Sequence, residues 1–133
     1  MIKYLCIILF ICLLFYTKKR THTIYGSVQR SAKELQKGLM FRKERLQINE
    51  GMLFKMRPNT HKNSVWMKNT YIPLDVIFLD TNMQVVGYKM NTGPLSLKTV
   101  KLDIPSSYIL EMNSGSVVGL GISVGDSVHF IEN

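Results

Sequence analysis

Polar residues able to do chemistry are concentrated in one stretch, residues 65–78, which reads VWMKNTYIPLDVIF. Lys68 offers a cation and Asp75 offers a carboxylate, in a segment whose other residues are mostly apolar. Asn69 and Thr70 add hydrogen-bonding groups between them. A buried carboxylate costs free energy unless it is paired or hydrogen-bonded. We therefore predict that Lys68 and Asp75 meet at one edge of a β core, directly or through the turn between them.

The alternation of side chains along a strand assigns these polar residues to faces. A strand at 64–68 places Lys68 on the same face as Trp66, and Trp is usually highly buried. A strand at 74–79 has apolar residues on both faces, as in a central strand, and Asp75 begins a face that apolar residues would bury. Two simpler roles stay open. Asp75 alone suits a carboxylate that accepts turn amides, and Lys68 alone suits a surface residue.

Clustered polar groups at the mouth of a β core are typical of small-molecule sites. In such a binding module, Trp66 would supply a flat apolar wall and Asn69 would fix the orientation of the ligand. Lys68 and Arg42 would favour an anionic or polyhydroxylated ligand. The predicted ligand-binding residues are Trp66, Lys68, Asn69, Thr70 and Asp75, with Arg42 and Glu50 as second contributors.

A catalytic alternative uses the same region. Asp75 or Glu50 would act as the general base of a hydrolase or lyase, and Lys68 would stabilise charge. No Ser–His or Cys–His pairing is indicated by position. The histidines are expected in a linker, a polar loop and the last strand, in the order His22, His61 and His129. A third alternative is a structural component of a membrane complex, and whether the chain is an enzyme stays open.

Neither a metal nor a cofactor is expected. Cys6 and Cys12 both lie in the N-terminal apolar run, so the folded part has no disulfide, thiol nucleophile or cysteine ligand. The methionines could bind copper(I) together with histidine. However, no M-x-x-M cluster lies near a histidine, and methionine fills irregular cores well. Core packing is therefore the better explanation of these residues.

The N-terminus is an apolar run from Tyr4 to Tyr16, with Lys3 before it and the basic segment 18–20 after it. Its length fits a signal-peptide core better than a full bilayer span, which needs about 20 residues. No small-residue cleavage site follows. We therefore predict that residues 1–20 form an uncleaved signal anchor or transmembrane segment that tethers the protein to a membrane. Basic residues on both flanks leave the side of the membrane open.

The formal net charge of +8 is unevenly distributed. Residues 21–68 carry ten basic and three acidic residues, whereas residues 69–133 carry three and six. A basic half can attract phosphates or an anionic membrane surface. These basic residues are scattered among turns, and no aromatic pair is interleaved with them, so we expect no nucleic-acid partner.

Short segments with strand character, separated by turn signals, make up the remainder of the chain. Ser31 and Glu34 match the capping box of a brief helix that Gly38 would end, and residues 115–121 allow one helical turn. The pattern predicts an all-β fold, a compact sandwich or partly open barrel of jelly-roll type with one or two very short helices, in a single domain over residues 21–133. The predicted strands are 22–29, 51–55, 64–68, 74–79, 83–90, 108–112 and 127–131.

Several of these motifs resemble a known family. WMKNT at 66–70, IPLD at 72–75 and Phe78 are similar to the signature of the bacterial, archaeal and phage proteins called domain of unknown function 192. The resemblance covers roughly residues 24–131. It implies a compact β fold of jelly-roll type, frequent export or membrane attachment, and no established activity. Further landmarks, in order, are GLMFR at 38–42, EGMLF at 50–54, Pro94 with Ser96, Leu110-Glu111 with Gly115, and GISVGDSV at 121–128.

Overall fold

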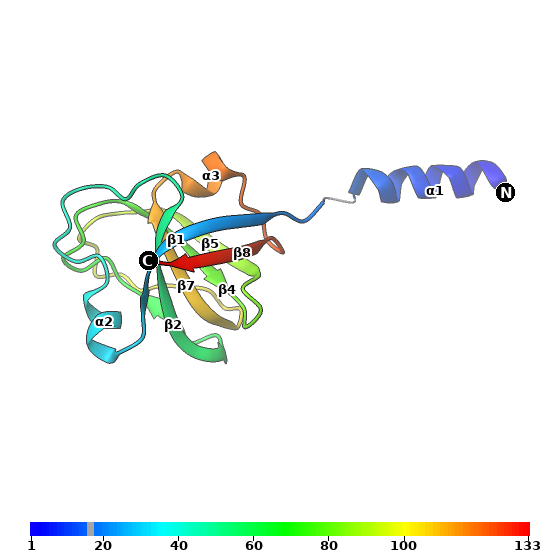
Figure 1. Cartoon of the computed structure of the whole chain (residues 1–133). Coiled ribbons are helices and arrows are strands. Elements are labelled where there is room, and N and C mark those ends of the chain that lie inside the picture. The colour runs from blue at the N-terminus through cyan, green and yellow to red at the C-terminus, as the bar shows by residue number, and fades with distance from the viewer. Residues whose placement is uncertain (16–17) are drawn as a thin grey trace.

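The computed structural model describes residues 1–15 and 18–133, and the side chains of all of these except 12–15. Figure 1 shows a β body with a separate N-terminal helix. In chain order the elements are α1 (Ile2–Phe15), β1 (Thr21–Gln29), α2 (Ala32–Lys37), β2 (Glu50–Thr60), β3 (Ser64–Val65), β4 (Leu74–Leu79), β5 (Val85–Thr92), β6 (Val100–Lys101), β7 (Ser106–Asn113), α3 (Ser116–Leu120) and β8 (Ser127–Glu132).

Most strands belong to one six-stranded sheet with the order β5-β4-β7-β2-β1-β8. β1 runs parallel to both of its neighbours, and the other pairs are antiparallel. The two edge strands approach each other at one end through a bridge between Gln84 and Ser127 and a hydrogen bond of 2.8 Å from Val85 N–H to the Asp126 carbonyl. The fold is therefore mostly β, with a curled half-barrel sheet and few short helices (Figure 1).

The core lies on both faces of this sheet. β4 is buried at all six positions, which confirms the expectation of a central strand covered on both sides. One face packs Val76 and Phe78 against residues of β2 and β7, with α2 and the small β3-β6 sheet nearby. The other face packs Ile77 and Leu79 with Val117 of α3. The predicted alternation along residues 74–79 is thus confirmed.

The capping box also forms as predicted. Ser31 Oγ accepts a hydrogen bond of 3.2 Å from Glu34 N–H, and the Glu34 carboxylate accepts one of 2.8 Å from Ser31 N–H. The helix ends at Gly38, whose φ of 45° lies in the left-handed region. A Cβ at this position would stand 3.0 Å from the ring of Phe54, so glycine also allows α2 to approach the sheet closely.

Two local predictions differ from the structure. The strand predicted over 64–68 ends at Val65, because residues 67–70 form a turn in which Asn69 adopts a φ of 52°. Asn tolerates this left-handed conformation, and the turn takes the chain out of the strand. The first strand begins at Thr21, so His22 lies in β1 and not in a linker. The short strand β6 was not predicted.

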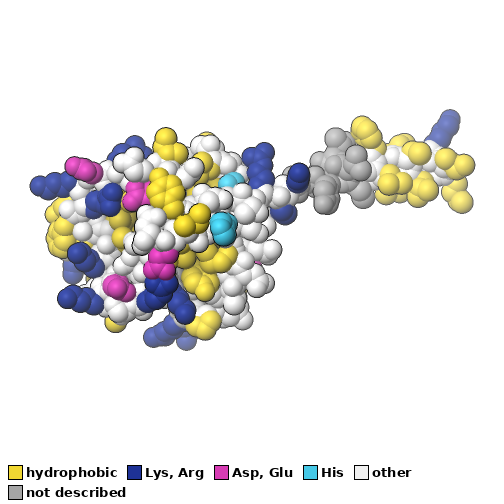
Figure 2. Space-filling view, viewed as in Figure 1, with side chains coloured by type: hydrophobic (Ala, Val, Ile, Leu, Met, Phe, Trp, Pro, Cys, Tyr) yellow, Lys and Arg dark blue, Asp and Glu magenta, His cyan; other side chains and the backbone are white. Residues whose placement is uncertain are grey.

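α1 is 14 residues long, and the apolar side chains of its residues 2–11 are exposed and form the yellow part of the helix in Figure 2. At 1.5 Å per residue it is about 21 Å long. Within the described residues, no helix reaches the length and apolarity required to cross a bilayer.

Candidate functional site

Asp75 is fully buried, and its carboxylate is hydrogen-bonded to backbone amides. Oδ1 accepts from Asn91 N–H at 2.9 Å, and Oδ2 accepts from Gly115 N–H at 3.1 Å and Val117 N–H at 2.9 Å. The last two amides lie at the start of α3, where free N–H groups favour an anion. Asp75 therefore fastens the start of α3 to the sheet and also binds Asn91 of the neighbouring strand β5.

The predicted meeting of Lys68 and Asp75 is wrong: in the described part of the chain the two form no ion pair. Lys68 is exposed, and its Nζ lies 5.0 Å from the centroid of the Trp66 ring, a cation–π contact. The reason is the turn after Val65, which directs Lys68 to solvent. The simpler role of Asp75, as an acceptor of backbone amides, is the one that forms, although those amides come from residues distant in sequence.

A second buried carboxyl group belongs to Glu111, in the middle of β7. Its register partners are Met52 of β2 and Val76 of β4, so it lies on the central strand between two others. The residue is only 4% exposed. No hydrogen bond or ion pair to its carboxyl group is formed within the described residues. Burial raises the pKa of Glu111 to about 8.

Glu111 lines a cavity of about 90 Å³. This volume corresponds to about three water molecules. The cavity lies between the end of α2, the turn that follows it, β2, β3 and the WMKNT turn. Its lining residues are Leu35, Gln36, Lys37, Gly38, Leu39, Met40, Phe54, Met56, Ser64, Val65, Trp66, Thr70 and Glu111. Trp66 is 42% exposed and Glu111 only 4%, so the indole lies toward the mouth and the carboxyl group toward the floor.

Backbone hydrogen bonds join three segments around this cavity. They are the turn after α2, the WMKNT turn, and the loop that holds Pro94 and Ser96. The WMKNT turn is the central one and bonds to both of the others. The bonds run from Phe41 N–H to the Asn69 carbonyl at 2.8 Å, from Leu95 N–H to the Thr70 carbonyl at 3.0 Å, and from Met67 N–H to the Ser96 carbonyl at 3.0 Å.

Each of these segments contains a residue with a left-handed backbone: Phe41 at φ 66°, Asn69 at φ 52° and Leu95 at φ 63°. This conformation is unfavourable for bulky side chains, and such residues gather at functional sites. Phe41 and Leu95 are also 57% and 56% exposed. Two of these turns thus contribute residues to the cavity lining, and Phe41 and Leu95, which do not line the cavity, present apolar side chains to solvent next to them.

The other predicted site residues are divided between this cavity and the surface. Trp66 and Thr70 line the cavity, and Thr70 Oγ1 donates to the Lys68 carbonyl at 3.2 Å. Arg42 and Glu50 do not line it. They face each other at 4.0 Å between Nη2 and Oε1, a weak pair at the surface. The structure brings together two of the seven predicted residues around one cavity, with Lys68 stacked on one of them.

Glu111 itself was not among the predicted site residues. It was quoted only as a landmark of the family resemblance, although it is the one charged residue in the strand SSYILEMN. A lone acid in an otherwise uncharged central strand is a usable signal, because such a residue is rarely buried without a reason. Among the described residues, no three side chains of the metal-binding types come together.

A further buried polar pair ties the N-terminal segment to the domain. His22 Nε2 lies 2.8 Å from Asp126 Oδ2, and the Asp126 carboxylate also accepts from Arg20 N–H and Ser123 N–H at 3.1 and 2.9 Å. Burial of Asp126 raises its pKa, but the hydrogen bonds from His22 and the two amides outweigh this effect and lower the pKa to about 2. This cluster connects the start of β1 to the turn before β8.

Comparison with known proteins places this geometry in a family. The model of DUF192, described as uncharacterized ACR, matches residues 15–130. A crystallised protein of unknown function from Novosphingobium aromaticivorans is similar at 37% identity and a TM-score of 0.71, over 77% of this chain and 71% of that chain. A "putative transcription regulator" from Sinorhizobium meliloti is similar at 31% identity and a TM-score of 0.68, over 77% of this chain and 78% of that chain. No curated protein matches the sequence. The chain belongs to the DUF192 family.

Proposed function

We propose that this domain is a binding module for a small polar ligand whose head group enters the cavity above Glu111. The observation that carries the proposal is a carboxyl group that is almost fully buried, has no partner in the described part of the chain, and lies at the floor of a cavity. Buried polar groups are nearly always hydrogen-bonded. No fully buried side-chain oxygen or nitrogen of the described residues lacks a hydrogen-bond partner, so the Glu111 carboxyl group reaches the open space of the cavity, where a ligand can supply its partner.

The size of the cavity limits what it can hold. Ligand pockets for drug-sized molecules have about 300 to 1,000 Å³, whereas this cavity has about 90 Å³. It therefore accommodates a head group of a few heavy atoms. The remainder of the ligand would lie along the exposed rim that includes Trp66 and Phe41, where apolar contact is available.

Lys68 has a supporting role in this proposal. Its ammonium group holds one face of the Trp66 ring, which restricts the indole at the mouth of the cavity. Asn69 gives its carbonyl to Phe41 and so positions the neighbouring turn. Arg42, Glu50 and Asp75 are not part of the proposed contact surface, since none of them lines the cavity.

Catalysis is the second candidate, and one observation favours it. A carboxyl group that lies at the floor of a cavity and whose pKa is raised to about 8 is suited to general acid–base chemistry. Glu111 would then replace Asp75 or Glu50 in that role. Turnover of a bound compound that disappears in Glu111→Gln, with binding retained, distinguishes this candidate from a pure binding module.

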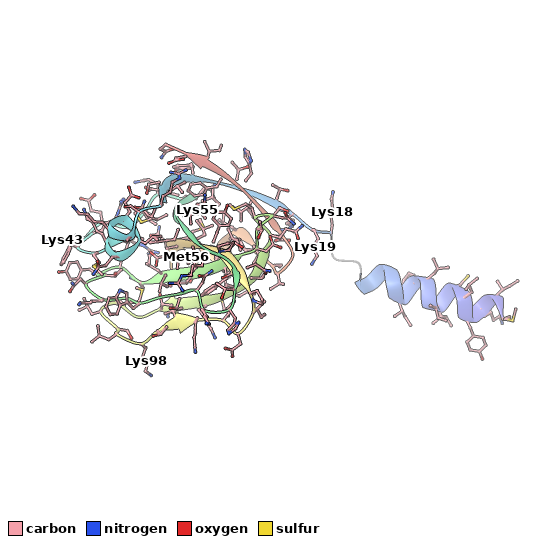
Figure 3. The ribbon with its side chains drawn as sticks, turned by 90° about the horizontal axis from the view of Figure 1, so that it is seen from below. Lys18, Lys19, Lys43, Lys55, Met56 and Lys98 are labelled. Atoms are coloured by element: carbon pink, nitrogen blue, oxygen red, sulfur yellow. The ribbon has the colours of Figure 1, made fainter. Side chains whose placement is uncertain are left out.

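Tethering to a membrane through residues 1–20 is also part of the proposal. β1, with nine residues, leads from this segment to the end of the domain that carries α2, a distance of about 30 Å. Figure 3 shows Lys18 and Lys19 at one end and Lys43 at the other. The cavity would thus open at the end distant from the bilayer, where ligands in the aqueous phase have access. Sedimentation of the intact protein with membranes tests this part.

The description of the Sinorhizobium meliloti relative suggests nucleic-acid binding as another possibility for this chain. Two features argue against proposing it. α2 and α3 have only six and five residues, which is short for a helix that reads the major groove. On the face shown in Figure 2, Lys and Arg side chains are spread around the domain and do not form a single basic stripe.

The proposal can be tested through Trp66, the only tryptophan in the chain. Its fluorescence is followed while small amines, alcohols, amides and carboxylates are added to the full-length protein in mild detergent. Binding should change the emission of the wild type and should be weakened by Ser64→Leu, which fills part of the cavity. Glu111→Gln replaces the acid at the cavity floor and is measured in the same way. Its matched control is Glu44→Gln, which replaces an exposed acid outside the cavity. A response equal in all variants, or none in the wild type, would contradict the proposal.

A further inference from the structure

We propose, on the basis of the binding module described above, that the head group bound in the cavity is an alkylammonium cation held by Glu111. The polar groups at the cavity, the nature of its walls and the charged groups around it each support this choice of ligand.

The buried polar side chains of the cavity are acceptors, Glu111 and Thr70, whereas the side-chain donors among its lining belong to residues that are exposed or half-buried: Gln36, Lys37, Ser64 and Trp66. The Glu111 carboxyl group has no partner in the described part of the chain. Thr70 Oγ1 gives its proton to the Lys68 carbonyl, so its lone pairs remain available to a ligand. The N–H groups of Gly38 and Met40 donate to the carbonyls of Glu34 and Lys37 and cannot serve a ligand. A ligand that brings its own donors fits this inventory.

The walls of the cavity suit a cation as well as an alkyl chain. Phe54 and Trp66 contribute aromatic rings, whose faces attract cations. Met40 and Met56 contribute polarizable thioethers that adapt to an alkyl group. Met56 belongs to β2, and Figure 3 labels it to the right of α2. An ammonium on a short alkyl stem therefore meets a carboxylate at the floor and apolar surfaces around its stem.

Two other charged residues belong to the surroundings of Glu111, and both are basic. Lys37 lines the cavity and Lys68 lies over Trp66, but the two side chains belong to exposed residues. Neither forms an ion pair with Glu111 within 4.0 Å. Solvent screens their repulsion of a bound cation. An anionic ligand, by contrast, would place its charge next to the Glu111 carboxyl group.

Binding of a cation to Glu111 has a proton balance that can be measured. At neutral pH the carboxyl group is mostly protonated, since burial raises its pKa to about 8. An alkylammonium ion stays protonated, and its binding favours the carboxylate. The step is RNH₃⁺ plus the neutral Glu111 carboxyl group giving the ammonium–carboxylate pair and one proton released to solvent. At pH 7 the expected release is about nine-tenths of a proton per ligand.

The test uses the full-length protein in mild detergent and three probes of similar size: n-butylammonium, 1-pentanol and butanoate. Trp66 fluorescence gives the affinity, and calorimetry in two buffers with different ionisation enthalpies gives the proton release. Butylammonium should bind most tightly, with an affinity that rises nearly tenfold from pH 6 to 7, less steeply from pH 7 to 8, and levels off above that. Glu111→Gln should remove this pH dependence and weaken butylammonium at least about tenfold, whereas Glu44→Gln should change neither.

The outcomes separate the two proposals. Butylammonium binding without proton release, or with equal strength in Glu111→Gln, overturns the ammonium assignment and leaves the binding module standing. If 1-pentanol or butanoate binds more tightly than butylammonium, the ammonium assignment is likewise overturned and the binding module stands. If none of the three probes, nor any compound of the wider panel, alters Trp66, then the binding module and the ammonium assignment both fail. Near-ultraviolet circular dichroism confirms in each case that the variant is folded.

Discussion

Replacing Glu111 by Gln is expected to make the protein more stable at alkaline pH and to change little at acid pH. The two side chains have nearly the same shape, and both can donate a hydrogen bond when the acid is protonated. Only the acid can ionise. The expected difference between the variants therefore comes from the protonation of Glu111 alone, and its direction follows from how burial moves the pKa of this group.

Burial raises the pKa of Glu111 from 4.5 to about 8. Between these two values the folded protein holds a proton that the unfolded chain has lost, so the stability of the wild type falls as pH rises. The slope is about 1.4 kcal/mol per pH unit, and over the whole interval the loss is on the order of 5 kcal/mol. Below about pH 4.5 both states carry the proton and the effect vanishes. Glu111→Gln should not show this loss.

The assay is urea unfolding of the full-length protein in mild detergent from pH 4 to pH 9, followed through Trp66. Near pH 4 the two proteins should unfold at similar urea concentrations, and by pH 8 Glu111→Gln should be several kcal/mol more stable. Glu44→Gln, which removes an exposed acid, should follow the wild type at every pH. Parallel curves for the wild type and Glu111→Gln would mean that Glu111 ionises equally easily in the folded and unfolded states, and that burial does not raise its pKa.

Three further predictions concern other parts of the molecule. Asp75→Asn should lower the free energy of unfolding by about 3 kcal/mol, since an amide cannot accept all three N–H groups that the carboxylate accepts. Lys68→Ala should lower it by less than about 1 kcal/mol. Additive losses in the double variant, measured by urea unfolding, would confirm that the two side chains do not interact. Asp126 has a pKa of about 2 in the folded protein, below its ordinary 3.8. Its ionised form should therefore contribute roughly 2 kcal/mol to the free energy of unfolding above about pH 4, and this contribution should be lost as pH falls toward 2. Acid unfolding of the wild type and of Asp126→Asn, which should lack this pH dependence, measures the contribution. Intact protein should sediment with membranes and keep Met1, and N-terminal sequencing that finds a start between Thr17 and Ser27 would contradict the anchor.

Local patterns predicted the parts of the fold that local physics controls. The apolar residues of 74–79 required a strand buried on both faces, and the spacing of Ser31 and Glu34 required a capped helix start; both are present. The turn between Lys68 and Asp75 was predicted, but it begins earlier, at Met67, because the β-favouring residues before it extend the strand pattern, while the left-handed conformation of Asn69 depends on bonds to segments distant in sequence.

The candidate site was harder to predict for a related reason. Asp75 has a nearby cation in the sequence, yet its partners are amides about 16 to 42 residues away, which no local pattern reveals. Glu111 has no partner to suggest a role, and its importance comes from a cavity formed by α2, β2 and the WMKNT turn together. Trp66 and Thr70 were predicted because they belong to the polar cluster of residues 66–75, in a segment that is otherwise mostly apolar.

Titration of the Glu111 side-chain carboxyl carbon by ¹³C NMR, with and without n-butylammonium, directly measures whether this buried acid binds a cation. We expect a midpoint near pH 8 in the free protein, caused by burial at the cavity floor, and a clear downward shift when the ammonium probe is bound. Exposed Glu44 serves as the internal reference and should not respond to the probe. A Glu111 midpoint near the ordinary 4.5, or one that the probe leaves unchanged, would show that Glu111 is not the cation-binding group.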